Sequence, residues 1–340
     1  MFNNYNEVLD KAREVLKGVC NVCPECNGMA CRGKVPGVGS KGSGNAFIRS
    51  WGTFKSIELN MDACHKHFDA DLSLELFGKK FDAPFFLAPI GGMKLNYGGI
   101  LSEEEYSRAS VFGALSEGLL SFTGDGPAEE YFTSTLPIIK EAGGIAIPTI
   151  KPWDQEKCKA RIDEIKKSGA IAFAMDVDSA SLVNLKLAGK PVYTKSSEEL
   201  KELADYAGIP FIVKGVMTAK AALECQKAGV YAIVISSHGG RVMEDCPATI
   251  SVVQEIREAV GADFKILVDG GIRSGADIFK CIAKGADAVL IGRPFAIAIH
   301  GGREEGVQLL AKKLKAELSE TMLMTDCKNL KEIDKTKIRQ

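Results

Sequence analysis

The chain has 340 residues, of which 46% are hydrophobic and 26% are charged, so it can bury a sizeable core as one large domain or two ordinary ones. Its formal net charge is -1, and acidic and basic residues are scattered along the whole chain. This distribution excludes the basic footprint of a nucleic-acid-binding protein and the polybasic patch of a membrane-surface protein. Small molecules are therefore the predicted partners.

Residues 1–83 predict an extension that caps the rest of the chain. The opening stretch, MFNNYNEVLDKAREVLKG, has a mixed-charge amphipathic helical pattern and lacks the apolar region of a signal peptide. No run of residues approaches the length of a membrane span. We therefore predict a cytoplasmic protein.

Four cysteines follow within the segment CNVCPECNGMAC, at Cys20, Cys23, Cys26 and Cys31. Their spacing, C-x2-C-x2-C-x4-C, is one residue longer at its end than the ferredoxin pattern. Such a group predicts a metal site that holds either zinc or an iron–sulfur cluster, and the spacing does not decide between them. The alternative is a group of reduced thiols packed against the fold. Four other cysteines fall in helical patterns and are predicted to be small buried residues: Cys158, Cys225, Cys281 and Cys327.

Two further features of the extension have weaker implications. The glycine-rich stretch 37–44, GVGSKGSG, lacks a preceding strand and the spacing of a nucleotide-binding loop, so it predicts a flexible loop that could cover an active site. His65 and His67 lie in the charged stretch CHKH, where solvated side chains are a more usual outcome than metal ligands.

From residue 84 the sequence alternates between short apolar runs and helical patterns. The predicted strands are 85–90, 119–124, 144–150, 170–177, 210–215, 231–237, 265–271 and 288–292. This rhythm predicts an α/β fold, a (β/α)8 barrel, with a doubly wound open sheet as the alternative. A long amphipathic helix is predicted for 304–325, outside the barrel. We thus predict a cap (1–83), a barrel (84–300) and a C-terminal helical extension (301–340).

An internal repeat favours the barrel, because 228–236 and 284–292 match in pattern and each follows a similar strand, turn and helix. In a barrel, the polar residues that follow the strands meet on one rim. The residues predicted to meet there are Asp176, Lys214, His238, Asp269 and Arg293.

Two glycine-rich turns follow the last two predicted strands, VDGGIRSG (268–275) and IGRP (291–294). Glycine lets the backbone approach a ligand closely, and Arg273 or Arg293 would supply a planar donor fork. Barrel enzymes often hold phosphate at these two positions. The turns therefore predict a phosphate-binding site.

Several segments resemble the FMN-dependent α-hydroxy acid oxidase and dehydrogenase family. They are IVKGV (212–216), SSHGGR (236–241), PAT (247–249), residues 267–294 and, more weakly, APIGGM (88–93) and NAF (45–47). The resemblance implies an FMN-binding barrel with His238 as the active-site base and Arg241 as the clamp on a substrate carboxylate. It also implies a set of residues around the cofactor: Pro89, Gly91, Ser121, Lys214, Asp269, Gly270, Gly271, Arg273, Gly292 and Arg293.

General chemistry supports three of these roles. A lysine such as Lys214 beside the edge of a flavin stabilises its negatively charged reduced form. A histidine near neutral pKa can take the substrate proton, and a carboxylate can orient its ring, so we predict a pair formed by His238 and Asp176. The guanidinium of Arg241 can bind a carboxylate through two parallel hydrogen bonds.

The sequence departs from the family in the expected substrate pocket. Pro148 and Ile150 replace a glutamine and a tyrosine, the segment after the fourth strand has no arginine, and the N-terminal segment around 31–39 has no tyrosine. Possible substitutes, chosen by their place in the sequence, are Lys151, Trp153, Arg32 and Lys34. The departures argue against a simple glycolate or lactate oxidase.

The predicted function is oxidation of a 2-hydroxy acid or a related carboxylated substrate, with electrons passed to FMN. One alternative is another FMN barrel activity, similar to type 2 isopentenyl diphosphate isomerase; that enzyme and inosine monophosphate dehydrogenase have related phosphate loops. A second is a flavin module that transfers electrons to a redox partner protein through the cysteine segment. A homo-oligomer is also expected.

Overall fold

The structure is a computed structural model that describes residues 1–339. Eight parallel strands form a closed barrel in the order β10-β11-β4-β5-β6-β7-β8-β9. They are β4 (Phe85–Ile90), β5 (Ser121–Thr123), β6 (Ile147–Ile150), β7 (Phe173–Asp176), β8 (Phe211–Val216), β9 (Ala232–Ile235), β10 (Lys265–Asp269) and β11 (Ala288–Ile291). The pairing of β11 with β4, from Val289 opposite Phe85 to Ile291 opposite Leu87, closes the sheet. The barrel prediction is therefore confirmed and the open sheet is excluded.

The strands are apolar because both of their faces are covered. All four residues of β9, and likewise of β11, are buried between the barrel interior and the surrounding helices. The helices and 3-10 turns of this part are α3 (Met93–Tyr97), α4 (Glu103–Leu115), α5 (Glu130–Thr133), α6 (Thr135–Glu141), α7 (Gln155–Ser168), η1 (Val177–Ser181), α8 (Val183–Leu187), α9 (Ser197–Ala207), α10 (Ala219–Lys227), η2 (His238–Gly240), α11 (Thr249–Val260) and α12 (Gly275–Ala283).

Serine residues begin three of these helices in the way that their sequence predicts. Ser102, Ser196 and Ser274 each accept a hydrogen bond from a backbone N–H in the first turn, and the acidic residue three positions later bonds back. This reciprocal arrangement satisfies two N–H groups that would otherwise lack a partner. The capped start of α12 directly follows the first glycine-rich turn.

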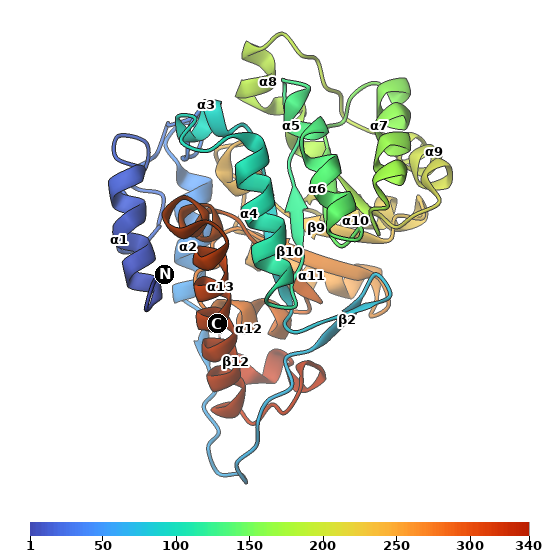
Figure 1. Ribbon diagram of the computed structural model, residues 1–340. Coiled ribbons are helices and arrows are strands. Elements are labelled where there is room, and N and C mark those ends of the chain that lie inside the picture. Colours follow the sequence, from blue (N-terminus) through green and yellow to red (C-terminus); the bar gives the residue numbers. More distant parts are fainter. Residues whose placement is uncertain (340) are drawn as a thin grey trace.

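The N-terminal extension contains α1 (Tyr5–Val15), α2 (Asn45–Lys55), β1 (Glu58–Leu59), β2 (Leu74–Leu76) and β3 (Lys79–Phe81). The C-terminal part contains α13 (Arg293–Leu323), η3 (Leu330–Glu332), η4 (Lys335–Lys337) and β12 (Ile338–Arg339). Helix α1 packs against α13, and β1 pairs antiparallel with β12, so the two ends of the chain lie on the same side of the molecule (Figure 1).

Helix α13 is interrupted at Arg303, whose φ of 48° and ψ of -130° are not helical. The helix predicted for 304–325 corresponds to the part after this residue, whereas the part before it begins immediately after β11. The boundary predicted at residue 300 thus falls inside α13. Within residues 1–339, no helix combines the length and the apolar character that a membrane crossing requires.

Candidate active site

A cavity of roughly 1160 Å³, open to solvent, lies at the C-terminal ends of the barrel strands. Its lining comes from the carboxyl ends of the strands and the segments that follow them, together with Val38 of the extension. The predicted site residues among this lining are Pro89, Gly91, Asp176, Lys214, His238, Arg241, Asp269, Gly270, Gly271, Arg273, Gly292 and Arg293. Charged side chains, backbone turns and apolar residues meet in this cavity, which is the composition of a ligand-binding site.

Lys214 forms the centre of a buried charge network. It stands opposite Asp176 in the pairing of β8 with β7, and its Nζ lies 3.0 Å from Asp176 Oδ1 and 3.6 Å from Asp269 Oδ2. Burial acts against the charge on Lys214, but Asp176 and Asp269 more than offset it and raise the pKa of the lysine. A permanent positive charge is thereby fixed at the wall of the cavity.

Asp176 is bound to two lysines. Besides Lys214, Lys151 Nζ lies 2.7 Å from Asp176 Oδ2, and both partners are buried. Burial raises the pKa of Asp176, but the charges of Lys151, Lys214 and His238 outweigh it, so that the pKa lies below its ordinary value. Asp176 is therefore a carboxylate that balances two buried cations.

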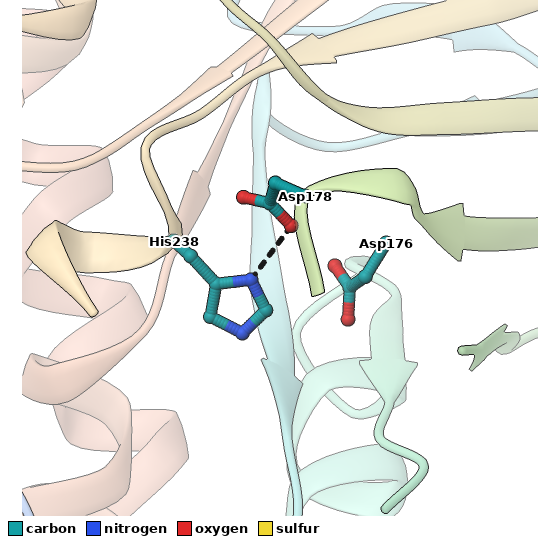
Figure 2. Close-up of side chains that lie close together, drawn as sticks. All are labelled: Asp176, Asp178 and His238. Carbon is teal, nitrogen blue, oxygen red and sulfur yellow. Dashed lines mark hydrogen bonds and ion pairs between the residues drawn. The ribbon is translucent and has the colours of Figure 1, made fainter. Parts of the chain in front are cut away.

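The predicted pairing of His238 with Asp176 is wrong. The Nδ1 atom of His238 lies 2.9 Å from Asp178 Oδ1 (Figure 2), whereas the carboxylate of Asp176 pairs with Lys151 and Lys214. The reason is local: β7 ends at Asp176, and the 3-10 turn η1 that follows carries Asp178 across to the histidine. Both side chains are largely enclosed, with 16% of His238 and 11% of Asp178 exposed.

The turn that carries His238 fixes its position. His238 adopts a φ of 53°, unusual for a residue other than glycine, and its backbone N–H donates to Ser236 Oγ at 3.0 Å. A hydrogen bond from Nδ1–H to Asp178 would leave Nε2 as the basic nitrogen. The geometry would allow His238 to act as a base while Asp178 orients its ring.

Arg241 is held by the glycine-rich stretch 37–44. Its Nη1 donates to the carbonyl oxygens of Gly37 at 2.5 Å and Gly39 at 3.3 Å, and its Nη2 donates to Asn96 Oδ1 at 2.9 Å. Burial, and then the charge of Arg293, lower the pKa of Arg241 to about 10, so it stays a cation at neutral pH. The stretch predicted to be a flexible loop is bound to the rim.

The two arginines of the predicted phosphate turns also contact the extension. Arg273 donates from Nε to the carbonyl oxygen of Cys26 at 3.0 Å. Arg293 donates to the carbonyl oxygens of Val38 and Gly39 at 2.9 and 2.7 Å, and its guanidinium lies 3.8 Å from the ring centre of Phe47. Three rim arginines therefore bind carbonyl groups of one N-terminal segment.

The first glycine turn brings backbone close to the cavity. Gly270 and Gly271 have φ values of 91° and 85°, which residues with a Cβ rarely adopt. A Cβ atom on Gly271 would also lie 2.2 Å from the carbonyl oxygen of Ser50 in α2. Glycine is therefore required here both by conformation and by space.

Of the remaining predicted residues, some line the cavity and others do not. Ser121, predicted to lie near the flavin, does not line the cavity: its hydroxyl lies 2.7 Å from Ser110 Oγ of helix α4. Lys151 does line it, whereas Trp153 and Arg32 do not, and Lys34 lines a different cavity.

Sequence reasoning missed Asp125, Asp178 and Asn96. Asp125 is buried and accepts hydrogen bonds from the N–H of Lys151 at 3.0 Å and from Trp153 Nε1 at 2.9 Å, which positions the segment after β6. Burial raises the pKa of Asp125. Asp178 could have been noticed as the second carboxylate of the DVD motif, but Asn96 gave no sequence signal.

Asp176, Asp178 and His238 could also be viewed as metal ligands, since one ligand atom from each lies within 4.8 Å of the others. Their existing partners argue against this role. Asp176 is paired with two lysines, and Asp178 Oδ1 lies 2.9 Å from His238 Nδ1. In the CHKH stretch, His65 bonds the carbonyl oxygen of Leu323 at 2.9 Å and His67 is exposed.

Comparison with solved structures shows the same fold. Two mandelate oxidase structures superpose with TM-scores of 0.79 and 0.80, at 22% sequence identity, and cover 97% and 100% of this chain. They are covered to 96% and 98% of their own length.

Curated relatives are oxidases of hydroxy acids. The peroxisomal (S)-2-hydroxyacid oxidase GLO3 of Arabidopsis thaliana is 36% identical over 174 residues, which is 51% of this chain and 44% of that protein. Human 2-hydroxyacid oxidase 1 is 39% identical over 43% of this chain and 39% of its own length. The matches thus span less than half of these two relatives. An L-lactate oxidase of Lacticaseibacillus rhamnosus is 25% identical over 88% of both chains.

The family model described as FMN-dependent dehydrogenase matches residues 38–190 and 187–340, which together include the barrel and most of the chain. This chain therefore belongs to the FMN-dependent dehydrogenase family.

Proposed function

We propose that the protein is an FMN-dependent oxidoreductase that oxidises a 2-hydroxy acid or a related carboxylated substrate. The observation that carries the proposal is the meeting of a base, a carboxylate-binding group and a buried cation in one cavity. His238 with Asp178, Arg241 and Lys214 supply these three functions. Two glycine–arginine turns complete the same cavity.

The residues around the cavity fit FMN. Asp269 Oδ1 is buried without a hydrogen-bond partner among the described residues, as expected for a group that meets a polar ligand. The turns at Gly270–Gly271 and Gly292 offer close backbone approach, and Arg273 and Arg293 offer positive charge, for the phosphate end. Lys214 would stabilise negative charge at the ring. When bound, FMN supplies an acceptor for two electrons.

The protein's own groups would handle the substrate. The substrate carboxylate would bind Arg241. Because Nη1 and Nη2 of this arginine already donate to Gly37, Gly39 and Asn96, the carboxylate must use the remaining N–H groups or displace a carbonyl group of the loop. His238 Nε2 would take the proton that leaves the substrate, and Asp178 would stabilise the resulting imidazolium. Lys151 lines the cavity near Asp176 and would add positive charge to the substrate end.

The test is anaerobic mixing of the flavin-loaded protein with a panel of 2-hydroxy acids, following loss of flavin absorbance. We expect at least one acid to reduce the flavin, and His238→Asn to slow this reduction at least about 100-fold with FMN retained. The exposed His67→Asn serves as the matched control and should reduce at the wild-type rate.

Other outcomes would contradict the proposal. Release of FAD on denaturation, or no flavin after reconstitution, would exclude an FMN enzyme. A flavin that dithionite reduces but no hydroxy acid reduces would favour the electron-transfer module. Turnover that requires a previously reduced flavin would favour an isomerase.

A further inference from the structure

A second cavity, of roughly 390 Å³, lies in the cysteine-rich segment against helix α13. Cys20, Cys23, Cys26 and Cys31 all line it, together with Ile297 of α13. The lining contains no carboxylate among the described residues. Four thiols from a twelve-residue stretch thus face one hollow.

Packing alone does not explain this arrangement. The cysteines that the sequence predicted to be core residues, Cys158, Cys225, Cys281 and Cys327, are fully buried, whereas the four around the cavity are half-buried. All ten cysteines are free thiols. Protein interiors are close-packed, so thiols that served only as core residues would be covered by neighbouring side chains instead of lining a cavity together.

Hydrogen-bond donors and positive charges of the surrounding residues lie close to the sulfur atoms. The backbone N–H of Val22 donates to Cys20 Sγ at 3.5 Å, and Arg273 Nη2 donates to Cys26 Sγ at 3.7 Å. Val22 holds a φ of 42°, sterically costly for a β-branched residue, at the bend between Cys20 and Cys23. Lys34 also lines the cavity. These donors suit thiolate ligands, whose negative charge needs compensation.

The spacing of the sulfur atoms distinguishes between kinds of metal centre. Around one zinc ion, Zn–S bonds of about 2.3 Å place tetrahedral sulfur atoms roughly 3.8 Å apart. Within residues 1–339, no three cysteine sulfurs lie within 4.8 Å of one another, although the Asp176, Asp178 and His238 ligand atoms do. In a four-iron cluster each thiolate binds a different iron, so the sulfurs stand farther apart.

We propose that Cys20, Cys23, Cys26 and Cys31 ligate a [4Fe–4S] cluster in this cavity. The C-x2-C-x2-C part of the motif is the run that such clusters use, and here the fourth cysteine lines the same cavity as the other three. Arg273 contacts both sites, because it lines the flavin cavity and donates to Cys26 Sγ. The proposal does not depend on the substrate of the barrel.

The test uses the whole chain, purified under anaerobic conditions and reconstituted with ferrous iron, sulfide and thiol. Iron, acid-labile sulfide and zinc are measured per chain, and the dithionite-reduced protein is examined by electron paramagnetic resonance. Cys23→Ser removes one ligand, and the exposed Cys64→Ser is the matched control. Thermal melting followed by circular dichroism checks that each variant is folded, and Cys31→Ser replaces Cys23→Ser if the latter is unfolded.

We expect about four iron and four sulfide per chain in the wild type and in Cys64→Ser, and less than about one iron in the ligand variant. Retained FMN in that variant would show that the barrel is intact. Less than about one iron per wild-type chain, one zinc without sulfide, or the same iron content in the ligand variant as in the wild type would overturn the proposal.

Discussion

Replacement of Asp178 by asparagine tests the base most directly. The substitution keeps the shape of the side chain but removes the charge that lies 2.9 Å from His238 Nδ1. Because only 11% of Asp178 and 16% of His238 are exposed, water can replace little of the lost interaction. The neutral imidazole loses its orienting partner, and the imidazolium formed on proton transfer loses its counter-ion.

The size of the effect follows from this geometry. A hydrogen bond to a charged group contributes about 1.5–3 kcal/mol when partly buried, and each 1.36 kcal/mol in a barrier changes a rate about tenfold. We therefore expect flavin reduction in Asp178→Asn to be roughly 10- to 150-fold slower. Substrate affinity should change less than about threefold, because Arg241 is intact.

Anaerobic stopped-flow mixing, with the acid that bleaches the flavin fastest, gives the limiting rate and the substrate dissociation constant separately. Asp245→Asn, at a side chain with 69% exposure near the same rim, is the control and should match the wild type. A wild-type limiting rate in Asp178→Asn, with FMN bound, would refute the assignment of Asp178 as the partner of the base.

Three other variants follow from the structure. Burial raises the pKa of Glu103 from 4.5 to about 7, so the folded protein keeps a proton that the unfolded chain releases, and the free energy of unfolding falls as pH rises through this window. In urea titrations between pH 4.5 and 8, Glu103→Gln should gain up to about 3 kcal/mol in stability over the wild type, whereas the exposed Glu104→Gln should not. Parallel pH curves for Glu103→Gln and the wild type would contradict this. Lys214→Gln leaves Asp269 without its cation and Asp176 with Lys151 alone, and it should lower the free energy of unfolding by roughly 3–5 kcal/mol. A loss below about 1 kcal/mol would show the network to be dispensable. A Cβ on Gly39 would lie 1.8 Å from the carbonyl oxygen of Cys31, so Gly39→Ala should make the extension more sensitive to limited proteolysis. Gly52 has open space around it, so Gly52→Ala should be digested like the wild type, and equal digestion of the two variants would refute the steric argument.

The barrel could be predicted from the sequence because its signals are local and repeated. Eight apolar runs, the turns between them and the matching units at 228–236 and 284–292 each depend on a few neighbouring residues. The cavity residues contributed by strand ends followed from the same logic, since parallel strands present their carboxyl ends at one rim.

The predictions for individual side chains that proved wrong depended on the direction in which each side chain points. Asp176 ends β7 and Asp178 lies two residues later in η1, and only the path of η1 decides which of them reaches His238. Ser121 lies on a barrel strand, but its side chain points to α4 rather than to the interior.

The contacts of Arg241 and Arg293 with the 37–39 carbonyls join segments that are far apart in the chain. No local pattern encodes such contacts.

The pairing of β1 with β12 has a consequence for the order in which the protein is assembled. Translation produces Glu58 and Leu59 early, but their partners Arg339 and Ile338 emerge only after the whole barrel has been made. Helix α1 likewise cannot pack against α13 until α13 has been made. These N-terminal elements are therefore made before the elements against which they pack. The cavity at the four cysteines likewise lacks Arg273 and Ile297 until the segments that follow β10 and β11 have been made.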